Sequence, residues 1–326
     1  MSTPPNLLVT GAAGFLGSEV LLRAAGRGLG VTGTARQARG PALAAITPAD
    51  ILVPGALDGL MPQGGVVVHA AGLAHAPHAA RDAFQAVNVE GTRHVMQSAI
   101  DRGVRRVVLV SSVAVYGNDR GVACDETADC LPTGPYAESK HDAEQLARRM
   151  AAAAGIELAV LRMSTIYGEA DRGNIMRLVN ALARGRFVWI GDGANRKSLV
   201  YKSDAADACL LAALHTGGPR CFNVSAPPVA MREIVEAISV ALGRTPPALR
   251  VPAALALMIA RAADVASVTL TGRARFAPPV TKWLSDEVFP ADHLMRDLGW
   301  APDVDVVEGL RRETDWFADT GGRVRT

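Results

Sequence analysis

The sequence predicts a doubly wound α/β fold, in which helices cover both faces of a mostly parallel β-sheet. Short β-rich runs alternate with Ala- and Leu-rich helical stretches through the first half of the chain, and a glycine-rich turn joins the first run to the first helical stretch. The expected strands are residues 6–10, 30–35, 51–53, 66–70, 105–111 and 157–162, and the expected crossover helices are residues 15–25, 80–102 and 136–154.

The second half of the chain has a looser pattern, which predicts a smaller mixed α/β part that binds substrate. We expect residues 1–166 to form the dinucleotide-binding domain and residues 167–326 mainly the substrate-binding part. Residues 198–216 are expected to return to the first domain. Helices are expected near residues 175–183, 204–215, 231–242 and 304–317, and short strands near residues 187–190 and 220–224.

An apolar stretch at residues 251–270 begins with Pro252 at its second position and is interrupted by Arg261 and Asp264. A helix that spans a bilayer needs about 20 consecutive, predominantly apolar residues. The stretch is therefore predicted to form one or two buried or interface helices, and no membrane partner is expected.

The composition indicates a globular protein whose partners are small molecules. Of the 326 residues, 49% are hydrophobic and 20% are charged, and the formal net charge is +2. This balance argues against disorder and against nucleic acid as the main ligand. Residues 1–6 lack the charged region of a signal peptide, so a cytoplasmic location is expected. The cysteines, which form no CxxC pair and are expected to be reduced thiols, are Cys124, Cys130, Cys209 and Cys221.

A TGxxGxxG turn follows the first expected strand. Gly11 permits the tight turn, Gly14 lets backbone N–H groups approach a pyrophosphate, and Gly17 allows the helix to pack closely on the strand. Phe15 and Leu16 lie inside the same turn and belong to the expected cofactor site. A tight βα turn without a ligand is the alternative, but the place of this turn at the first strand–helix junction favours dinucleotide binding.

The end of the second expected strand indicates which nicotinamide cofactor binds. An NAD enzyme usually has an acidic residue there, which holds the ribose hydroxyls. This chain has Arg36, with Arg39 close behind, and an arginine can pair with a 2′-phosphate. The expected cofactor is NAD(P), with a preference for NADP; a solvated arginine at the start of a loop is the alternative.

The strongest chemical pattern places Tyr136 and Lys140 four residues apart, at the start of a long expected helix. Residues at this spacing share a helix face. A phenol is a poor base at neutral pH, but a neighbouring ammonium and an oxidised nicotinamide favour its phenolate. Ser111 and Ser112 end the fifth expected strand, at the sheet edge where doubly wound proteins bind ligands. We therefore expect Tyr136 to transfer a proton, with Lys140 and Ser112 in support.

Together these residues resemble the extended short-chain dehydrogenase/reductase family, which contains sugar-nucleotide epimerases, dehydratases and ketoreductases. The resemblance covers nearly the whole chain and implies proton transfer by a tyrosine coupled to hydride transfer at an alcohol carbon. The implied catalytic residues are Ser112, Tyr136 and Lys140. The implied substrate residues are Ser112, Thr165 and Arg196. The implied cofactor residues are Gly11, Gly14, Phe15, Leu16, Gly17, Arg36, Leu57, Ala70, Ala71, Gly72, Asn88, Ser111, Tyr136 and Lys140.

Three departures from the family pattern limit what the resemblance implies. Thr165 stands where many epimerases have an asparagine. Ala56 stands where an acidic residue commonly recognises adenine, so that Leu57 could offer only backbone contacts. No residue matches the family's second diphosphate arginine clearly, and Arg273 and Arg275 are the candidates.

Two further groups of residues have more than one interpretation. Arg196 matches an arginine that contacts the diphosphate in sugar-nucleotide enzymes, and its planar fork suits phosphate oxygens; it could instead pair with Asp192 or Asp204. A histidine cluster lacks the carboxylate or cysteine partners that a metal site needs, so no metal is expected and its members are taken as structural or rim residues. The members are His69, His75 and His78.

The implied reaction has several forms. A dehydrogenase or ketoreductase acting at C4 of a nucleoside diphosphate sugar would consume cofactor, whereas a 4-epimerase would oxidise and re-reduce one carbon with tightly bound NAD. The chain could also be a reductase of a non-nucleotide ketone, or a regulator that binds NAD(P) without catalysis. Members of the family often dimerise through a four-helix bundle, which implies a homodimer built on residues 80–102 and 136–154.

Overall fold

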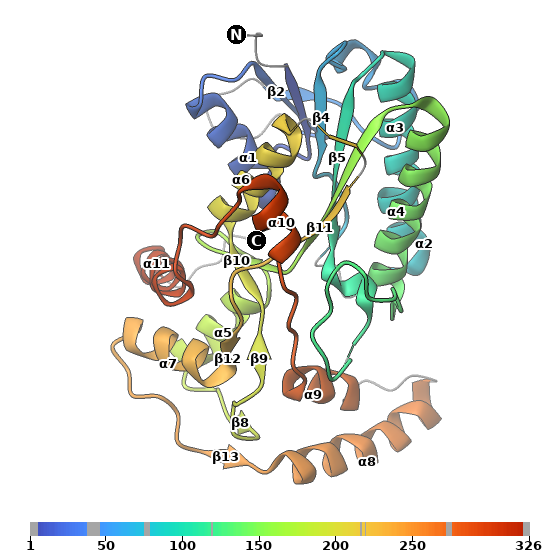
Figure 1. Ribbon diagram of the computed structural model, residues 1–326. Helices are drawn as coiled ribbons and strands as arrows, with labels where there is room; N and C mark the ends of the chain where they lie inside the picture. Colours follow the sequence, from blue (N-terminus) through green and yellow to red (C-terminus); the bar gives the residue numbers. More distant parts are fainter. Residues whose placement is uncertain are drawn as a thin grey trace.

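A seven-stranded sheet forms the centre of the protein (Figure 1). The computed structural model describes residues 6–37, 46–74, 79–118, 120–215, 217–218, 220–271 and 276–321. The strand order is β11-β6-β5-β4-β1-β2-β3, and each neighbouring pair is parallel. The predicted doubly wound fold is confirmed. Sheets of this kind bind ligands outside the carboxyl ends of the strands where the order reverses, here β1 and β4.

The strands of the sheet are continuous apolar runs near its centre. Every residue of β1 and β4 is buried, as expected where helices cover both faces. The strands are β1 (Leu7–Thr10), β2 (Val31–Ala35), β3 (Ile46–Pro48), β4 (Val66–His69), β5 (Arg106–Ser112), β6 (Glu157–Met163) and β11 (Arg220–Val224).

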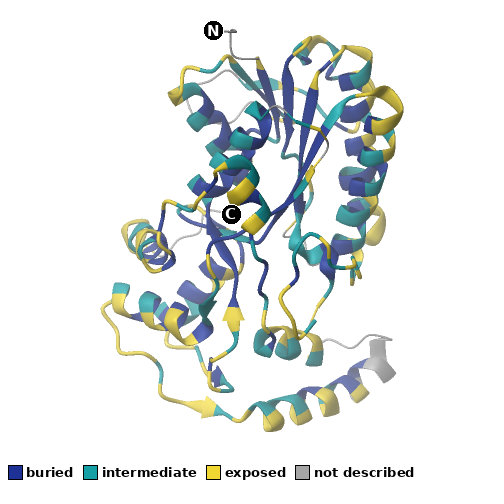
Figure 2. Cartoon of the chain, viewed as in Figure 1, coloured by how far each residue is buried: buried dark blue, intermediate teal, exposed yellow. Residues whose placement is uncertain are grey.

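Helices pack on both faces of the sheet and keep their outer sides exposed (Figure 2). On one face α1 (Phe15–Gly26) packs against α6 (Lys202–Leu214). The helix α6 belongs to the stretch expected to return to the dinucleotide-binding domain. On the other face α3 (Gly91–Asp101) packs against α4 (Pro135–Ala154).

The second half of the chain forms a smaller part with its own apolar core. Its strands pair as β7 (Thr165–Tyr167) with β10 (Leu199–Tyr201), β9 (Arg196–Lys197) with β12 (Val229–Ala230), and β8 (Trp189–Ile190) with β13 (Arg250–Val251). Its helices are α5 (Asn174–Ala183), α7 (Met231–Ala241), α8 (Ala253–Thr271), α9 (Ala277–Leu284) and α11 (Val306–Asp319). The helix α10 (Asp292–Leu298) instead packs against α6 and β11 of the large sheet. In the first half of the chain, two short 3₁₀ turns, η1 (Asp58–Leu60) and η3 (Val113–Tyr116), follow the strands β3 and β5.

The prediction of a third strand at residues 51–53 is wrong. These residues form a turn, and the strand next to β2 is β3. The carboxylate of Asp50 accepts a hydrogen bond from the N–H of Leu52 at 3.0 Å, and such local bonds favour turns over strands. Ile51 is buried against Gly91, while Leu52 and Val53 are exposed. Of the apolar run 51–53, only Ile51 is buried, and it is buried by packing and not by pairing with a strand.

One predicted helix also differs from the structure, and a second is present but only partly buried. Residues 80–102 are not one regular helix: α2 (Arg81–Phe84) is followed by the π-helical turn η2 (Gln85–Glu90) and then by α3. The stretch 251–270 forms one helix, α8, as predicted; several of its apolar side chains are exposed, so the buried alternative is wrong and the interface alternative stays a prediction. Among the described residues, no helix is both long and apolar enough to cross a bilayer.

The glycine turn can be tested through the packing of α1. A methyl group on Gly17 would overlap the carbonyl oxygen of Gly11 and lie 2.7 Å from its carbonyl carbon. We expect Gly17→Ala to lower the free energy of unfolding by about 1–3 kcal/mol, because the backbone must move apart. A Cβ on Gly26, at the end of the same helix, would meet no atom within 4 Å. Gly26→Ala should therefore leave stability unchanged or raise it by about 0.4–1 kcal/mol.

Urea unfolding of the two variants beside the wild type measures both effects. Equal stability of Gly17→Ala and the wild type would show that the turn does not hold α1 this closely.

Candidate active site

The glycine turn holds the start of α1 at the carboxyl end of β1. Gly11 has a φ of +70°, and a Cβ on it would lie 2.7 Å from the Cα of Ala71, so only glycine fits. The N–H of Gly14 donates to the carbonyl of Gly11 at 2.8 Å. The first turn of α1, which begins at Phe15, carries no acidic residue. Its N–H groups have no partners within the helix and favour an anion, so this turn fits a pyrophosphate.

The segment after β4 lies directly beside this turn. Ala71 donates its N–H to the hydroxyl of Thr10 at 3.3 Å. The side chain of Asn88 holds Leu73 in both directions: its oxygen accepts the Leu73 N–H at 2.7 Å, and its nitrogen donates to the Leu73 carbonyl at 3.0 Å. A Cβ on Gly72 would lie 3.2 Å from the Asn88 amide oxygen. The segment 70–73 is therefore clamped between β1 and the π-helical turn η2.

Asn88 also connects this segment to the helix that carries the candidate acid–base group. Its side-chain nitrogen donates to the hydroxyl of Ser139 at 2.9 Å, and Ser139 donates to the carbonyl of Tyr136 at 2.8 Å. Both Asn88 and Ser139 are buried. Irregular π-helical turns occur frequently at functional sites, and here the turn places one side-chain amide within reach of both the 70–73 segment and α4.

A buried polar chain links the glycine turn to the same asparagine. Thr92 donates to the carbonyl of Asn88 at 2.6 Å, so its oxygen accepts from Nε2 of His69 at 3.0 Å, and Nδ1 of His69 accepts from Thr10 at 2.7 Å. Burial, helped by the charge of Lys140, lowers the pKa of His69 to about 3. The imidazole is therefore neutral and serves as a structural link.

Tyr136 and Ser112 come together at the carboxyl end of β5. The hydroxyl of Ser112 accepts from the N–H of Ala114 at 3.2 Å, which caps η3. Burial raises the pKa of Tyr136, and a side-chain hydrogen bond with Ser112 opposes the increase. The ring of Phe84 packs edge-on against Tyr136, with centroids 6.2 Å apart. The phenol is thus held in its protonated form beside a second hydroxyl.

Lys140 lies between the end of β5 and the segment after β4. Its ammonium donates to the carbonyl of Val110 at 2.5 Å, and a Cβ on Gly72 would lie 3.9 Å from its Nζ. Burial lowers the pKa of Lys140 to about 8, and the nearby carboxylate of Glu144 opposes this. The side chain is therefore mostly charged at neutral pH.

The sequence pattern did not reveal a buried ion-pair network behind these residues. Ser111 donates to Glu144 at 2.5 Å, and Arg162 donates to both oxygens of the same carboxylate. Arg148 adds a third partner at 2.9 Å. These hydrogen bonds and charges hold the pKa of Glu144 low although burial opposes them. In the sequence Glu144 stands four residues after Lys140 and shares its helix face, but this spacing does not point to Arg162 or Ser111.

The remaining expected residues lie at varied positions. Thr165 is half-buried on β7, Leu57 is buried in the core ahead of η1, and Arg36 is exposed after β2. Arg196 is 56% exposed and pairs with Asp286 at 3.9 Å. The carboxylate partners suggested for Arg196 are wrong, since Asp192 caps a turn and Asp204 accepts from Val304. The residues that lie outside the described part of the chain are Arg39, His75, His78, Arg273 and Arg275.

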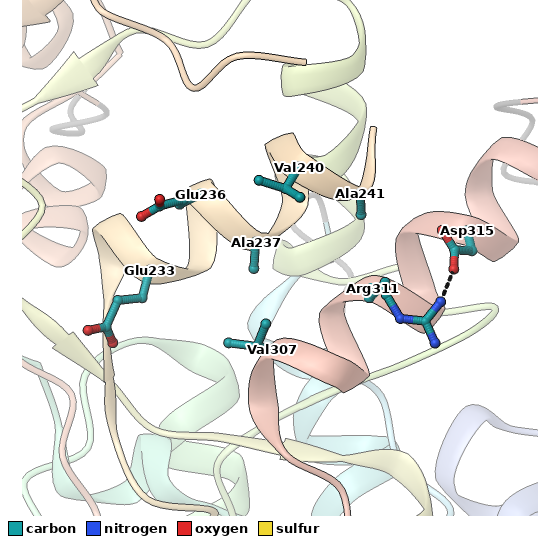
Figure 3. Close-up of a pocket in the computed structure, with 8 residues that line it drawn as sticks. All are labelled: Glu233, Glu236, Ala237, Val240, Ala241, Val307, Arg311 and Asp315. Carbon is teal, nitrogen blue, oxygen red and sulfur yellow. Dashed lines mark hydrogen bonds and ion pairs between the residues drawn. The ribbon is translucent and has the colours of Figure 1, made fainter. Parts of the chain in front are cut away.

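A surface groove between α7 and α11 is separate from this site (Figure 3). Val240 and Val307 line it, and Arg311 at its edge is paired with Asp315 at 2.5 Å. It shares no residue with the expected catalytic, cofactor or substrate sets. The groove therefore adds nothing to the candidate chemistry.

A glycine turn at a helix start, a clamped segment beside it and a Ser–Tyr–Lys group at the same sheet edge define a nicotinamide-dependent enzyme of the doubly wound class. The profile of the NAD dependent epimerase/dehydratase family matches residues 7–225, and the chain belongs to this family. The resemblance to extended short-chain dehydrogenases/reductases is thereby confirmed. The protein is an NAD-dependent oxidoreductase or epimerase.

The chain is similar to proteins whose names give different substrates. It is 30% identical to a 2-alkyl-3-oxoalkanoate reductase of Stenotrophomonas maltophilia, over 94% of this chain and 98% of that protein. It is 31% identical to an N-acetyl-alpha-D-glucosaminyl-diphospho-ditrans,octacis-undecaprenol 4-epimerase of Escherichia coli, over 57% of each chain. The solved structure of MoeE5 in complex with UDP-glucose and NAD matches with a TM-score of 0.76 at 26% identity, over 97% of this chain and 99% of that one.

The clamp by Asn88 leads to a stability prediction. Asn88→Ala removes hydrogen bonds to Leu73 and Ser139 and leaves their buried groups without partners. We expect the free energy of unfolding to fall by about 2–4 kcal/mol, with weaker binding of NADH, because a buried polar group without a partner costs about 1–3 kcal/mol.

A matched control comes from the same turn. The side-chain amide of Gln85 donates a hydrogen bond to the carboxylate of Asp142 at the surface. Gln85→Ala should therefore change the free energy of unfolding by less than about 0.5 kcal/mol. Chemical unfolding and NADH fluorescence titration measure both effects. Similar small losses in the two variants would rule out the clamp.

Proposed function

We propose that this protein catalyses proton and hydride exchange at a secondary alcohol or ketone carbon, with Tyr136 as the proton-transfer group. The observation that carries the proposal is the contact between Tyr136 and Ser112 at the ligand edge of the sheet, with Lys140 on the same helix face. The glycine turn and the segment 70–73 offer a site for the dinucleotide beside it.

In the proposed mechanism Ser112 and Tyr136 donate hydrogen bonds to the oxygen of the substrate. The raised pKa of Tyr136 keeps its proton available at neutral pH, so it can protonate an alkoxide as a ketone is reduced. In the reverse direction the positive charge of Lys140 favours the phenolate, which accepts the alcohol proton. The bound nicotinamide would supply or accept the hydride.

We propose a nucleoside diphosphate sugar, reacting at C4, as the substrate. MoeE5 was solved with UDP-glucose. The Escherichia coli relative is named as a 4-epimerase of a glucosaminyl-diphospho-undecaprenol, which supports reaction at C4 of a diphosphate-linked sugar but carries a polyprenol in place of a nucleoside. Arg196 is exposed and could exchange its long contact with Asp286 for a diphosphate. Thr165, on β7, is the second proposed substrate contact. A 4-epimerase would keep NAD bound through the cycle, whereas a reductase or dehydrogenase would turn it over.

A reductase of a non-nucleotide ketone is a second candidate function. The relative named as a 2-alkyl-3-oxoalkanoate reductase matches nearly the whole of both chains. Such an enzyme would use the same Ser112 and Tyr136 contacts but would have no use for a diphosphate partner at Arg196. Binding of free UDP distinguishes the two candidates.

The same proposal covers domain roles, assembly and location. Residues 1–166 with 198–216 would bind the dinucleotide, and most of residues 167–326 would bind substrate. A homodimer would form through the exposed sides of α3 and α4, which lie next to each other on one face of the sheet. The four cysteines are free, which supports a reducing, cytoplasmic setting.

Tyr136→Phe tests the reaction. We expect the loss of one hydroxyl to lower kcat by about 10²–10⁴-fold, because the substrate oxygen loses its proton donor or acceptor. Affinity for NADH should change little. Absorbance of reduced nicotinamide, recorded with a panel of nucleoside diphosphate sugars and their keto forms, gives the rate, and fluorescence titration gives the affinity. Undiminished turnover in the variant would remove Tyr136 from the mechanism.

The preference for NADP rests on Arg36. We expect the wild type to bind NADPH more tightly than NADH, and Arg36→Gln to weaken NADPH binding about 10–100-fold while NADH changes less than about twofold, because a charge-assisted bond contributes about 1.5–3 kcal/mol. Arg105→Gln is the matched control, since Arg105 is exposed at the opposite, amino end of β5. Isothermal titration with both cofactors measures the four affinities. Equal losses for NADH and NADPH would contradict a 2′-phosphate contact.

A further inference from the structure

Tyr116 ends the short turn η3, which begins directly after Ser112. The hydroxyl of Ser112 caps the turn through the N–H of Ala114, and the N–H of Gly117 donates to the carbonyl of Ala114 at 3.0 Å. The turn packs against α4, the helix that carries Tyr136. Because η3 is only four residues long and is hydrogen-bonded at both ends, a side chain that fixes its last residue also restrains the hydroxyl at its start.

The side chain of Tyr116 is fully buried and is held by three contacts. Its hydroxyl donates to the amide oxygen of Asn223 on β11 at 2.8 Å. The ring of Phe289 stacks on it with centroids 5.8 Å apart, and the guanidinium of Arg162 lies 4.8 Å from its centroid. Burial raises the pKa of Tyr116, so the phenol stays protonated and acts as the donor to Asn223. Its hydroxyl is therefore engaged within the protein and does not face a substrate.

Asn223 is a fixed anchor for this hydroxyl. It is fully buried on β11, and its side-chain nitrogen donates to the carbonyl of Cys124 at 2.9 Å. Its backbone N–H donates to the carboxylate of Glu126 at 2.6 Å. Both partners belong to the segment 120–134, which leads into α4. One asparagine on the edge strand therefore holds both η3 and the approach to the helix of the candidate acid–base group.

We propose that Tyr116 is a positioning residue for the reaction, because its bond to Asn223 holds η3 and with it the hydroxyl of Ser112. Held in this way, the Ser112 hydroxyl stays within reach of Tyr136. The inference rests on the proposed roles of Ser112 and Tyr136. A misplacement of about 1 Å far from the chemistry can cost about 10²-fold in rate. Loss of one bond from a turn whose other contacts remain should cost less.

Displacement of Ser112 would also change Tyr136 itself, which a simple loss of stability would not do. The hydrogen bond with Ser112 lowers the pKa of Tyr136 against the effect of burial. If η3 shifts and this bond weakens, the phenol becomes harder to ionise. Lys140 lies on α4 and not on the turn, so its ammonium remains beside Tyr136. Oxidation of an alcohol, which needs the phenolate, should then require a higher pH.

Tyr116→Phe tests the proposal, because it removes one hydroxyl and keeps the ring that Phe289 and Arg162 contact. We expect kcat to fall about 3–10-fold in the assay that Tyr136→Phe abolishes, with less than about a twofold change in the affinity for NADH. In the direction of alcohol oxidation, the pH of half-maximal kcat should rise by about 0.4–1 pH unit. Stopped assays across the pH range measure both effects.

NMR of the protein labelled with ¹³C at the Cζ of tyrosine gives a readout that needs no substrate. The chain has four tyrosines, so the spectrum contains four signals, and single Tyr→Phe variants assign them. The Cζ signal of Tyr136 should move in Tyr116→Phe in the same direction as in Ser112→Ala, because both changes weaken the same hydrogen bond.

Tyr167→Phe is the matched control. Tyr167 is also fully buried, and its hydroxyl donates to the carbonyl of Val306 on α11 at 3.2 Å. Each variant should lower Tm by about 1–4 °C, but Tyr167→Phe should keep the kcat, the pH profile and the Tyr136 signal of the wild type.

An unmoved Tyr136 signal in Tyr116→Phe would overturn the proposal. Equal losses of kcat in Tyr116→Phe and Tyr167→Phe would overturn it as well, since the effect would then be one of stability alone. Full turnover in Tyr136→Phe would instead contradict the proposed reaction. The Tyr136 signal would still report whether Tyr116 holds Ser112 in place, so the two failures are distinguishable.

Discussion

The side-chain amide of Asn88 is the contact on which the candidate site depends. It holds Leu73 after β4 and Ser139 on α4, and Ser139 holds the carbonyl of Tyr136. One buried group therefore sets the position of the expected cofactor segment relative to the expected acid–base residue. A catalytic group must stay within about 0.5 Å of its working position. Buried, fully paired hydrogen bonds provide that rigidity better than apolar packing does, since they specify direction as well as distance.

The polar chain through His69 extends this control to the glycine turn. Its pKa of about 3 means that the imidazole stays neutral throughout the physiological range, so the bonds from Thr10 and to Thr92 keep the same direction. On the other side of α4, Glu144 ties the helix to Arg162 on β6. A buried ion pair adds little net stability, but loss of one partner leaves a costly buried charge. Both sets of contacts fix where α4 lies on the sheet.

Local patterns explain how much of this could be predicted from sequence. The glycine turn and the Tyr136–Lys140 spacing depend on neighbouring residues, and the structure places Ser112 beside Tyr136 as expected. The contacts of Asn88 are with residues 15 and 51 positions away, and Arg162 is 18 positions from Glu144. Nothing in a single sequence marks such pairs. The wrong third strand has the same origin: Ile51 is buried by tertiary packing against Gly91 and not by pairing with a strand.

Burial has opposite effects on the pKa values of the two central groups, and this determines their resting states. It raises the pKa of Tyr136 and lowers that of Lys140 to about 8, so both are driven toward their uncharged forms. The site alone therefore resists the phenolate–ammonium pair that oxidation of an alcohol requires. Glu144 counteracts this at Lys140, and Ser112 counteracts it at Tyr136. An oxidised nicotinamide brings a positive charge, which stabilises a phenolate. Activation of Tyr136 as a base is therefore expected to follow binding of the oxidised cofactor, whereas its role as an acid needs no such help.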